Sequence, residues 1–143
     1  MKKITVVSPC FNEEDNVEIC ARTVQDIFDR HLPGYAREHV FIDNASTDHT
    51  VEILRAMAAA DPAIKVVVNA RNFGVFRSTF NGLRHATGDA ILVMLPVDLQ
   101  DPPELIGSFV ALRTDTKPFD DVRVRRALNM AINKKEVIAA HYV

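Results

Sequence analysis

Tryptophan is absent from this chain of 143 residues, and cysteine occurs only twice. Cys10 and Cys20 match neither a zinc spacing nor a redox pair, which predicts free thiols in a reducing compartment. No apolar run approaches the roughly 20 residues that span a bilayer, and the short run after Lys2 and Lys3 meets Pro9 too early for a signal peptide. The formal net charge of -2 lacks the basic excess typical of nucleic-acid binders. These absences favour a soluble, cytoplasmic globular protein that does not bind nucleic acid.

What the chain does contain is an alternation of strand and helix patterns. Apolar, β-branched runs cover residues 4–8, 39–42, 64–68 and 90–94. Helical patterns separate them: one capped by Asn12 and ended at residues 33–34, one from near residue 46 to before residue 62, and one over 75–86 with Gly88 as its C′ residue. This alternation predicts an α/β protein with a mainly parallel sheet and flanking helices.

The fourth apolar run is followed by a short polar segment. The run over 90–94 is typical of a strand buried on both faces, so Asp98 should emerge just past its carboxyl end, where open α/β sheets bind ligands. Asp98 and Gln100 offer oxygen ligands suited to a hard divalent cation that bridges a diphosphate. An Asx-turn is the alternative for Asp98. Asp101, followed by two prolines and Glu104, is more typical of a helix cap than of a metal ligand.

Three further loops follow the other strands and should lie along the same sheet edge. They cover residues 9–13, 43–48 and 69–74, and supply carboxylates, an arginine and helix N-termini that favour phosphate. Each loop alone is more typical of helix capping and turn chemistry than of a site. Only the set of three, in this order, indicates a binding site.

As a set, these segments resemble the family 2 glycosyltransferases, and among them the polyprenyl-phosphate sugar transferases of the dolichyl-phosphate mannose synthase type. The matching text lies at residues 6–14 (VVSPCFNEE), 42–48 (IDNASTD), 71–74 (RNFG), 81–82 (NG), 86–89 (ATGD) and 98–104 (DLQDPPE). The resemblance covers roughly residues 1–112. It implies the Rossmann-like, nucleotide-binding half of a GT-A fold, which binds a nucleoside-diphosphate sugar with Mg²⁺ or Mn²⁺.

The resemblance also implies roles for single residues. Pro9, Phe11 and Glu13 would line the nucleoside pocket. Asp43 would meet the base, and Arg71 would lie near the ribose or the phosphates. Asp89 would support the site from behind, and Asp98 and Gln100 would be the metal ligands. The full set of implied donor-binding residues is Pro9, Phe11, Glu13, Asp43, Asn44, Arg71 and Asp89.

This chain departs from the family pattern at three points. Pro96 stands where the family's metal motif has its first aspartate, and Asn44 stands where the base-binding loop has a second one. The family's catalytic domain also runs on for about as many residues again, and that further part would bring the acceptor site and any catalytic base. The resemblance therefore implies a polyprenyl phosphate or other acceptor, at the membrane surface in the parent protein, but assigns no catalytic residue here.

The last part of the chain has a different character. Residues 116–138 resemble a segment of the periplasmic oligopeptide-binding proteins, which predicts a helical appendage of foreign origin over 113–143, joined between Leu112 and Thr116. The chain is then a chimera with a nucleotide-sugar-binding half at 1–112. An unfinished sheet edge would favour a homodimer. The alternatives to a transferase are an orphan nucleotide-binding module and an inactive chimeric or designed scaffold.

Overall fold

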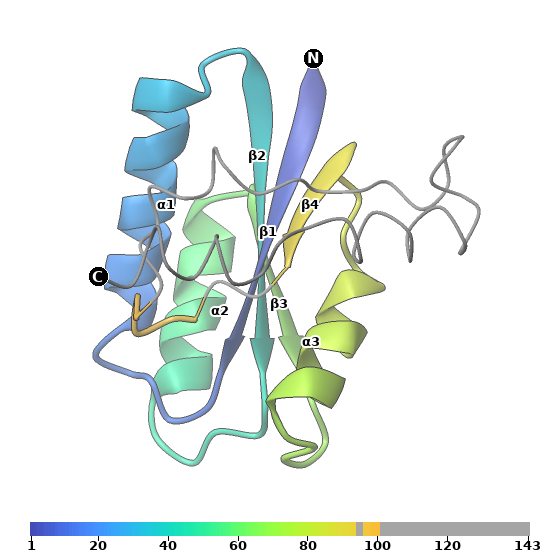
Figure 1. The fold of residues 1–143 in the computed structure, drawn as a ribbon. Coiled ribbons are helices and arrows are strands. Elements are labelled where there is room, and N and C mark those ends of the chain that lie inside the picture. The colour runs from blue at the N-terminus through green and yellow to red at the C-terminus, as the bar shows by residue number, and fades with distance from the viewer. Residues whose placement is uncertain (94–95, 101–143) are drawn as a thin grey trace, which may run out of the picture. The chain divides into compact units, whose positions relative to one another are not determined.

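The computed structural model describes residues 1–93 and 96–100 (Figure 1). Strands and helices alternate through this part of the chain, as the sequence predicts. Residues 101–143 lie outside it, and with them the predicted cap Asp101 and the predicted appendage over 113–143. The elements are β1 (Lys2–Cys10), α1 (Val17–His31), β2 (Tyr35–Asp43), α2 (Thr50–Ala60), β3 (Ile64–Val68), α3 (Val75–Leu83) and β4 (Ala90–Val93).

The four strands form one parallel sheet in the order β3-β2-β1-β4. β1 pairs with β2 along its whole length, from Lys2 opposite Tyr35 to Cys10 opposite Asp43, and pairs with β4 on its other side. The chain thus runs outward through β2 and β3 and then returns past β1 (Figure 1). Such a reversal of strand order creates a crevice at the carboxyl ends of the two strands that flank it. Here those strands are β1 and β4.

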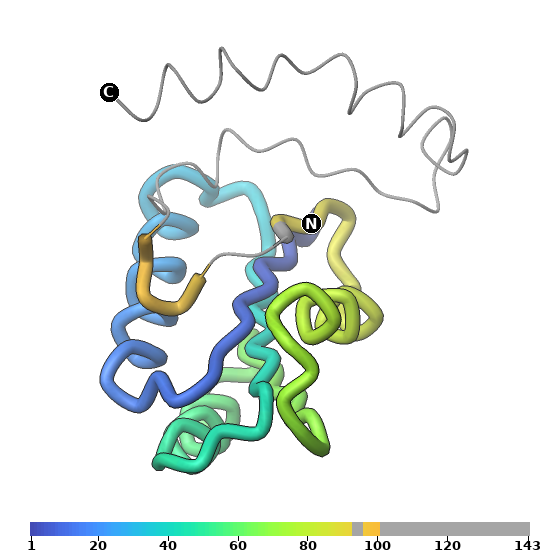
Figure 2. The backbone as a smooth tube through the Cα atoms, turned by 60° about the horizontal axis from the view of Figure 1, so that its bottom comes forward, coloured from blue at the N-terminus to red at the C-terminus, as the bar shows by residue number. Residues whose placement is uncertain are grey.

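Helices cover both faces of the sheet. α1 and α2 lie on one face and α3 lies on the other (Figures 1 and 2). Successive residues of a strand point to opposite faces, so Val6 and Phe41 pack in the α1–α2 layer, while Val7, Val40 and Ile42 pack in the α3 layer. Burying each such side chain contributes about 1.5–3 kcal/mol. This burial on both faces explains why the strands appear in the sequence as continuous apolar runs.

The first two helices begin later than predicted. The predicted cap Asn12 has φ 56°, and its side-chain oxygen accepts from the Thr47 N–H at 2.8 Å instead of capping a helix. A turn follows, in which the Asn16 N–H donates a hydrogen bond to the Glu13 carbonyl, and α1 starts at Val17. α2 starts at residue 50, not near residue 46. The polar residues before each helix therefore join two loops, an effect that local capping rules cannot anticipate.

Two predictions for the third crossover are also wrong. α3 ends at Leu83 rather than residue 86, and Gly88 is not its C′ residue. Gly88 instead lies against Thr5: its N–H donates to Thr5 Oγ1 at 2.9 Å, and a Cβ there would lie 2.5 Å from that oxygen. Ala90 and Ile91 are half-buried rather than buried, since β4 pairs only with β1 among the described strands. None of the described helices is long and apolar enough to cross a membrane.

Candidate functional site

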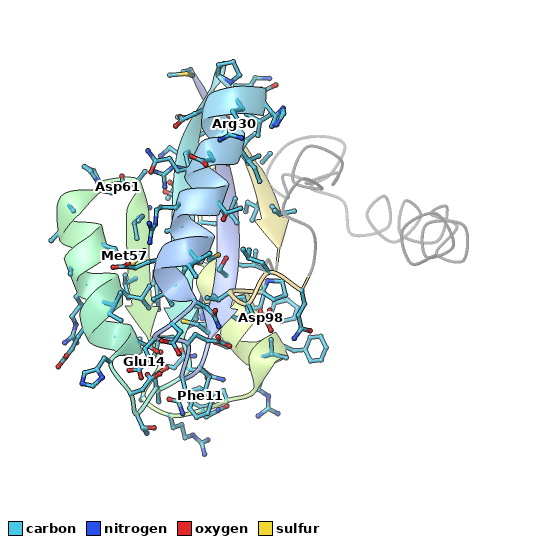
Figure 3. All side chains as sticks on the ribbon, turned by 90° about the vertical axis from the view of Figure 1, so that its left-hand side faces the viewer. Phe11, Glu14, Arg30, Met57, Asp61 and Asp98 are labelled. Atoms are coloured by element: carbon cyan, nitrogen blue, oxygen red, sulfur yellow. The ribbon has the colours of Figure 1, made fainter. Side chains whose placement is uncertain are left out.

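The described residues form a cleft of about 330 Å³ at the carboxyl ends of the strands. It is lined from the loops after β1, β2 and β3, which the sequence places along one edge. The lining residues are Pro9, Cys10, Phe11, Glu13, Asn44, Asn72, Gly74 and Val75. Four of the seven predicted donor-binding residues thus share one cleft. Figure 3 shows Phe11 and Glu14 at this end of the molecule and Asp61 at the opposite end.

Backbone N–H groups of the loop after β1 donate to side-chain hydroxyls that follow β2, which holds the two segments together. The Asn12 N–H donates to Ser46 Oγ at 2.9 Å, and the Glu13 N–H donates to Thr50 Oγ1 at 2.8 Å. Next to them, Glu14 accepts from both the backbone and the ring of His49. These bonds hold the pKa of Glu14 below its usual value, and the same contact raises the pKa of His49. One wall of the cleft is therefore built before any ligand arrives.

Asn44 fastens the third loop to the other two. Its side-chain oxygen accepts from the Phe73 N–H at 2.9 Å and from Asn69 Nδ2 at 3.2 Å, and its Nδ2 donates to Asn72 Oδ1 at 2.8 Å. Sequence reasoning assigned Asn44 to the donor and missed Asn69 and Asn72. The available signal was an asparagine recurring directly after β2 and again after β3, since carboxamides can both donate to and accept from one another.

Two other predicted donor-binding residues lie near the cleft but do not line it. Asp43 is fully buried, and its two carboxylate oxygens accept from the backbone N–H and the hydroxyl of Ser46. Its predicted contact with the base stays a prediction. Arg71 is exposed, with its Cζ 4.7 Å from the centroid of the Phe73 ring, a cation–π distance. This contact holds the guanidinium against Phe73 within the third loop.

The structure places Asp89 away from the other predicted donor-binding residues. It precedes β4 and lies at the amino-terminal edge of the sheet, opposite to the cleft. Its N–H donates to the Lys3 carbonyl at 2.7 Å, and its Oδ2 accepts from the Lys3 N–H at 2.8 Å. Asp89 therefore ties β4 to the start of β1, which is a different place from the one that the resemblance implied.

The predicted metal ligands lie in an exposed turn beyond β4. Asp98 Oδ1 accepts from the Gln100 N–H at 3.3 Å, the pattern of the Asx-turn that the sequence left open. The Pro96 carbonyl already accepts from the Leu99 N–H at 3.1 Å. Within residues 1–93 and 96–100, no group of three or more histidine, cysteine, aspartate or glutamate side chains is placed to hold a metal ion. One carboxylate and one amide fit a cation that keeps water and substrate phosphates as its other ligands, as Mg²⁺ does.

Both cysteines are buried free thiols, as predicted. Burial raises the pKa of Cys20 to about 12. The pKa of Cys10, which lines the cleft, is raised further, first by burial and then by the nearby Asp43 and Glu13 carboxylates. Since the thiolate is the reactive form, neither residue has the character of a nucleophile.

A parallel sheet with a reversal of strand order and a cleft at the carboxyl ends of its strands defines a Rossmann-like α/β domain of the ligand-binding type. The model of the family described as Glycosyl transferase family 2 matches residues 5–135. The chain belongs to this family.

Curated relatives agree with the family. The chain is 45% identical over 104 residues to the prophage bactoprenol glucosyl transferase homolog of Escherichia coli K12, and 43% identical to the bactoprenol glucosyl transferase of Shigella phage SfX. Each match covers 73% of this chain and 33% of the relative. The chain thus spans about a third of the length of the curated relatives it matches.

Solved structures show the same fold. A mannosyltransferase from Pyrobaculum calidifontis, in complex with GDP-Man and Mn²⁺, superposes with a TM-score of 0.55 at 27% identity, covering 68% of this chain and 28% of that one. Glucosyl-3-phosphoglycerate synthase from Mycobacterium tuberculosis, in complex with Mn²⁺, UDP and phosphoglyceric acid, gives 0.54 at 27% identity, covering 74% and 37%. The predicted Rossmann-like architecture, a parallel sheet with flanking helices that matches GT-A glycosyltransferases, is therefore confirmed for the described residues.

Proposed function

We propose that this chain binds a nucleoside-diphosphate sugar, as the donor-binding part of an enzyme that transfers the sugar to a polyprenyl phosphate. One observation carries the proposal: three loops that the sequence singles out separately converge on one cleft at the carboxyl ends of β1, β2 and β3. The relatives support the reaction, because their names specify glucosyl transfer with bactoprenol. The two solved structures named above support the donor class, since they hold GDP-Man and UDP.

In this proposal the cleft residues divide between the parts of the donor. Phe11 is 42% exposed at the cleft, which leaves an aromatic face for a base, and Glu13 provides a carboxylate that can accept from base or ribose donors. Arg71 would meet the ribose or the phosphates. Asp98 and Gln100 would hold Mg²⁺ or Mn²⁺, which would offset the charge that builds on a departing diphosphate.

A second candidate is a donor-binding module without turnover. It is favoured by one observation, namely that the chain covers a third of the relatives' length. The acceptor site and any catalytic base would then come from a part that these 143 residues do not contain. Transfer of labelled sugar from UDP-glucose to undecaprenyl phosphate separates the two: incorporation into lipid supports the enzyme, and donor binding without incorporation supports the module. A scaffold with neither property is the third outcome.

The foreign origin of residues 113–143 stays a prediction. The family match runs to residue 135, so it includes most of that segment. Removing residues 113–143 and comparing the melting temperature of the two chains tests whether the segment stabilises the family domain. Sedimentation of the same two chains tests the proposed homodimer, which would persist after truncation if the unfinished sheet edge forms it.

The proposal is tested by thermal unfolding with UDP or GDP, each with and without Mn²⁺. A ligand that binds only the native state at about a hundred times its Kd stabilises it by about 2.7 kcal/mol, which raises Tm by several degrees. We expect such a rise with one nucleotide and a greater rise with Mn²⁺, and we expect Asp98→Ala to lose the Mn²⁺-dependent part.

The matched control is Asp29→Ala, which removes an exposed carboxylate from α1, outside the cleft. This variant should keep the full nucleotide-dependent rise. A chain that melts cooperatively but responds to neither nucleotide would contradict donor binding. A rise that Asp29→Ala and Asp98→Ala lose equally would contradict the role of the turn beyond β4.

A further inference from the structure

Large apolar side chains are exposed to solvent on the outward side of α3. Phe76 and Phe80, one helical turn apart, are 71% and 70% exposed. The inward side of the same helix is made of small residues, with Ser78, Thr79 and Gly82 buried against the sheet. Two phenylalanines on the outside of a helix whose inside is small and polar reverse the usual amphipathic arrangement. Packing among residues 1–93 and 96–100 does not explain them.

The same side of α3 is positively charged. Arg77 precedes Phe80 by three residues and Arg84 follows it by four, so these residues and Phe76 share one side, here called the α3 outer face. Residues 66–88 contain no aspartate or glutamate, but they contain Arg71, Arg77 and Arg84. The whole chain has a net charge of -2, so this concentration of positive charge is local.

The α3 outer face also lies next to the cleft. α3 lies on the face of the sheet opposite to α1 and α2 (Figure 2). Its first residue, Val75, and the preceding Gly74 line the cleft. Whatever covers the α3 outer face is therefore held beside the proposed donor site, within one or two helical turns of it.

We propose that the α3 outer face docks on an anionic lipid surface. Phe76 and Phe80 enter the boundary between headgroups and acyl chains, and Arg77 and Arg84 meet the lipid phosphates while their stems lie along the apolar layer. This inference rests on the proposed function in one respect: a polyprenyl phosphate acceptor is itself presented by a membrane. Docking through α3 would bring the mouth of the cleft to the surface where that acceptor lies.

Charge favours a lipid surface over a second copy of this chain. A symmetric pair through the α3 outer face would set the arginines of one copy against those of the other, with no carboxylate on that helix to compensate. An anionic membrane supplies the missing negative charge and the apolar layer together. Each basic residue near such a surface contributes about 1 kcal/mol of attraction, which is screened by salt.

The test is co-sedimentation of the full 143-residue chain with vesicles of phosphatidylcholine alone and of phosphatidylcholine with phosphatidylglycerol. Two double variants remove the α3 outer face: Phe76→Ser with Phe80→Ser, and Arg77→Gln with Arg84→Gln. Matched controls change equivalent residues on α1: Ile19→Ser, which removes a 51% exposed apolar side chain, and Arg22→Gln with Arg30→Gln. Circular dichroism and a cooperative melt confirm that each variant folds.

We expect binding to the anionic vesicles only, weakened by salt and reduced about tenfold or more in both α3 variants but not in the α1 controls. Absence of binding in the folded chain, or equal loss in the α1 controls, overturns the proposal. So does a dimer that the phenylalanine variant dissociates without any vesicle binding. The nucleotide-dependent rise in Tm is measured on the same samples. Its absence contradicts the donor site alone, whereas its presence without vesicle binding contradicts membrane docking alone.

Discussion

Single side chains at the carboxyl edge of the sheet bond mainly to one another. Asp43 accepts from Ser46 and supports the cleft without lining it. Asn44 lines the cleft and also bonds to the loop after β3. Phe11 and Glu13 line the cleft as well. A site whose supporting residues are already bonded loses little conformational freedom when a ligand arrives. At this scale, Asn44 is a positioning residue for the third loop.

Replacing Asn44 by aspartate should destabilise the protein although the two side chains have the same shape. The amide Nδ2 donates to Asn72 Oδ1 at 2.8 Å, and a carboxylate would set two acceptors against each other in a buried place. Losing such a bond costs about 1–3 kcal/mol. We expect that decrease in the free energy of unfolding, measured in urea for Asn44→Asp.

The reciprocal variant is its control. Asn72 contributes an oxygen that accepts from both Asn44 Nδ2 and the Gly74 N–H, and an aspartate keeps that oxygen. Asn72→Asp should therefore stay within about 0.5 kcal/mol of the original chain. If the two variants are equally stable, the amide of Asn44 does not hold the loop.

Among the elements, α3 depends most on a close approach to the sheet. Gly82 lies where a Cβ would be 2.8 Å from Val7 Cγ1 and 3.2 Å from Ile42 Cγ2. Glycine costs about 1 kcal/mol relative to alanine in an exposed helix interior. At this position the lack of a side chain instead allows the helix to pack directly on β1 and β2, and so brings Gly74 and Val75 to the cleft.

Gly82→Ala should lower the stability in spite of the better helix propensity of alanine. Forcing an extra methyl group into a packed layer typically costs about 1–3 kcal/mol, which exceeds the gain in propensity. Gly34→Ala is the matched control, because a Cβ at Gly34 meets no atom within 4 Å. Differential scanning calorimetry should show a lower Tm for Gly82→Ala and an unchanged or slightly higher Tm for Gly34→Ala. A higher Tm for Gly82→Ala would contradict the close approach.

At the scale of the whole molecule, two buried ionisable residues of β2 govern stability against pH. His39 is fully buried, with its Nε2 2.9 Å from Ser8 Oγ, and burial, aided by the nearby Arg37 charge, lowers its pKa to about 3. Glu38 accepts from Thr5, Thr87 and Lys65; although burial opposes it, these bonds together lower its pKa to about 2. Both residues therefore favour folding in their deprotonated forms.

Stability should consequently fall as the solution is acidified. The unfolded chain protonates His39 below pH 6.5 while the folded chain does not until about pH 3, so its contribution is complete above pH 6.5 and is lost toward pH 3. Glu38 adds a loss between about pH 4.5 and 2. Between pH 7.5 and 5 we expect His39 to lower the free energy of unfolding by about 2 kcal/mol, as measured in urea, while the raised pKa of the exposed His49 acts in the opposite direction.

The variant His39→Gln should flatten this dependence above pH 5, since glutamine does not titrate. His85→Gln, which replaces an exposed histidine, should leave the slope unchanged. A slope that persists in His39→Gln would assign the pH dependence to other residues.

The sequence by itself determined the class of fold and the place of the site. Apolar runs that alternate with helical patterns imply parallel strands, and parallel strands bring the loops at 9–13, 43–48 and 69–74 to one edge, because every crossover returns the chain in the same direction. Composition and periodicity suffice for these two results, since they concern local pattern and strand direction. The choice of Pro9, Phe11, Glu13 and Asn44 within the loops came instead from the resemblance to the family 2 glycosyltransferases, and all four line one cleft.

Only the tertiary structure decided how individual polar residues are used. Asn12 and Gly88 carry strong local signals for helix ends, yet Asn12 bonds to Thr47 and Gly88 lies against Thr5, each across at least 35 residues of chain. Asp89 precedes β4 and Asp98 follows it, so the two residues lie at opposite ends of the parallel strands. The physical reason is that hydrogen bonds between distant segments outweigh local preferences for helix caps, which are worth about 1 kcal/mol. Such distant pairings cannot be predicted from a short stretch of sequence.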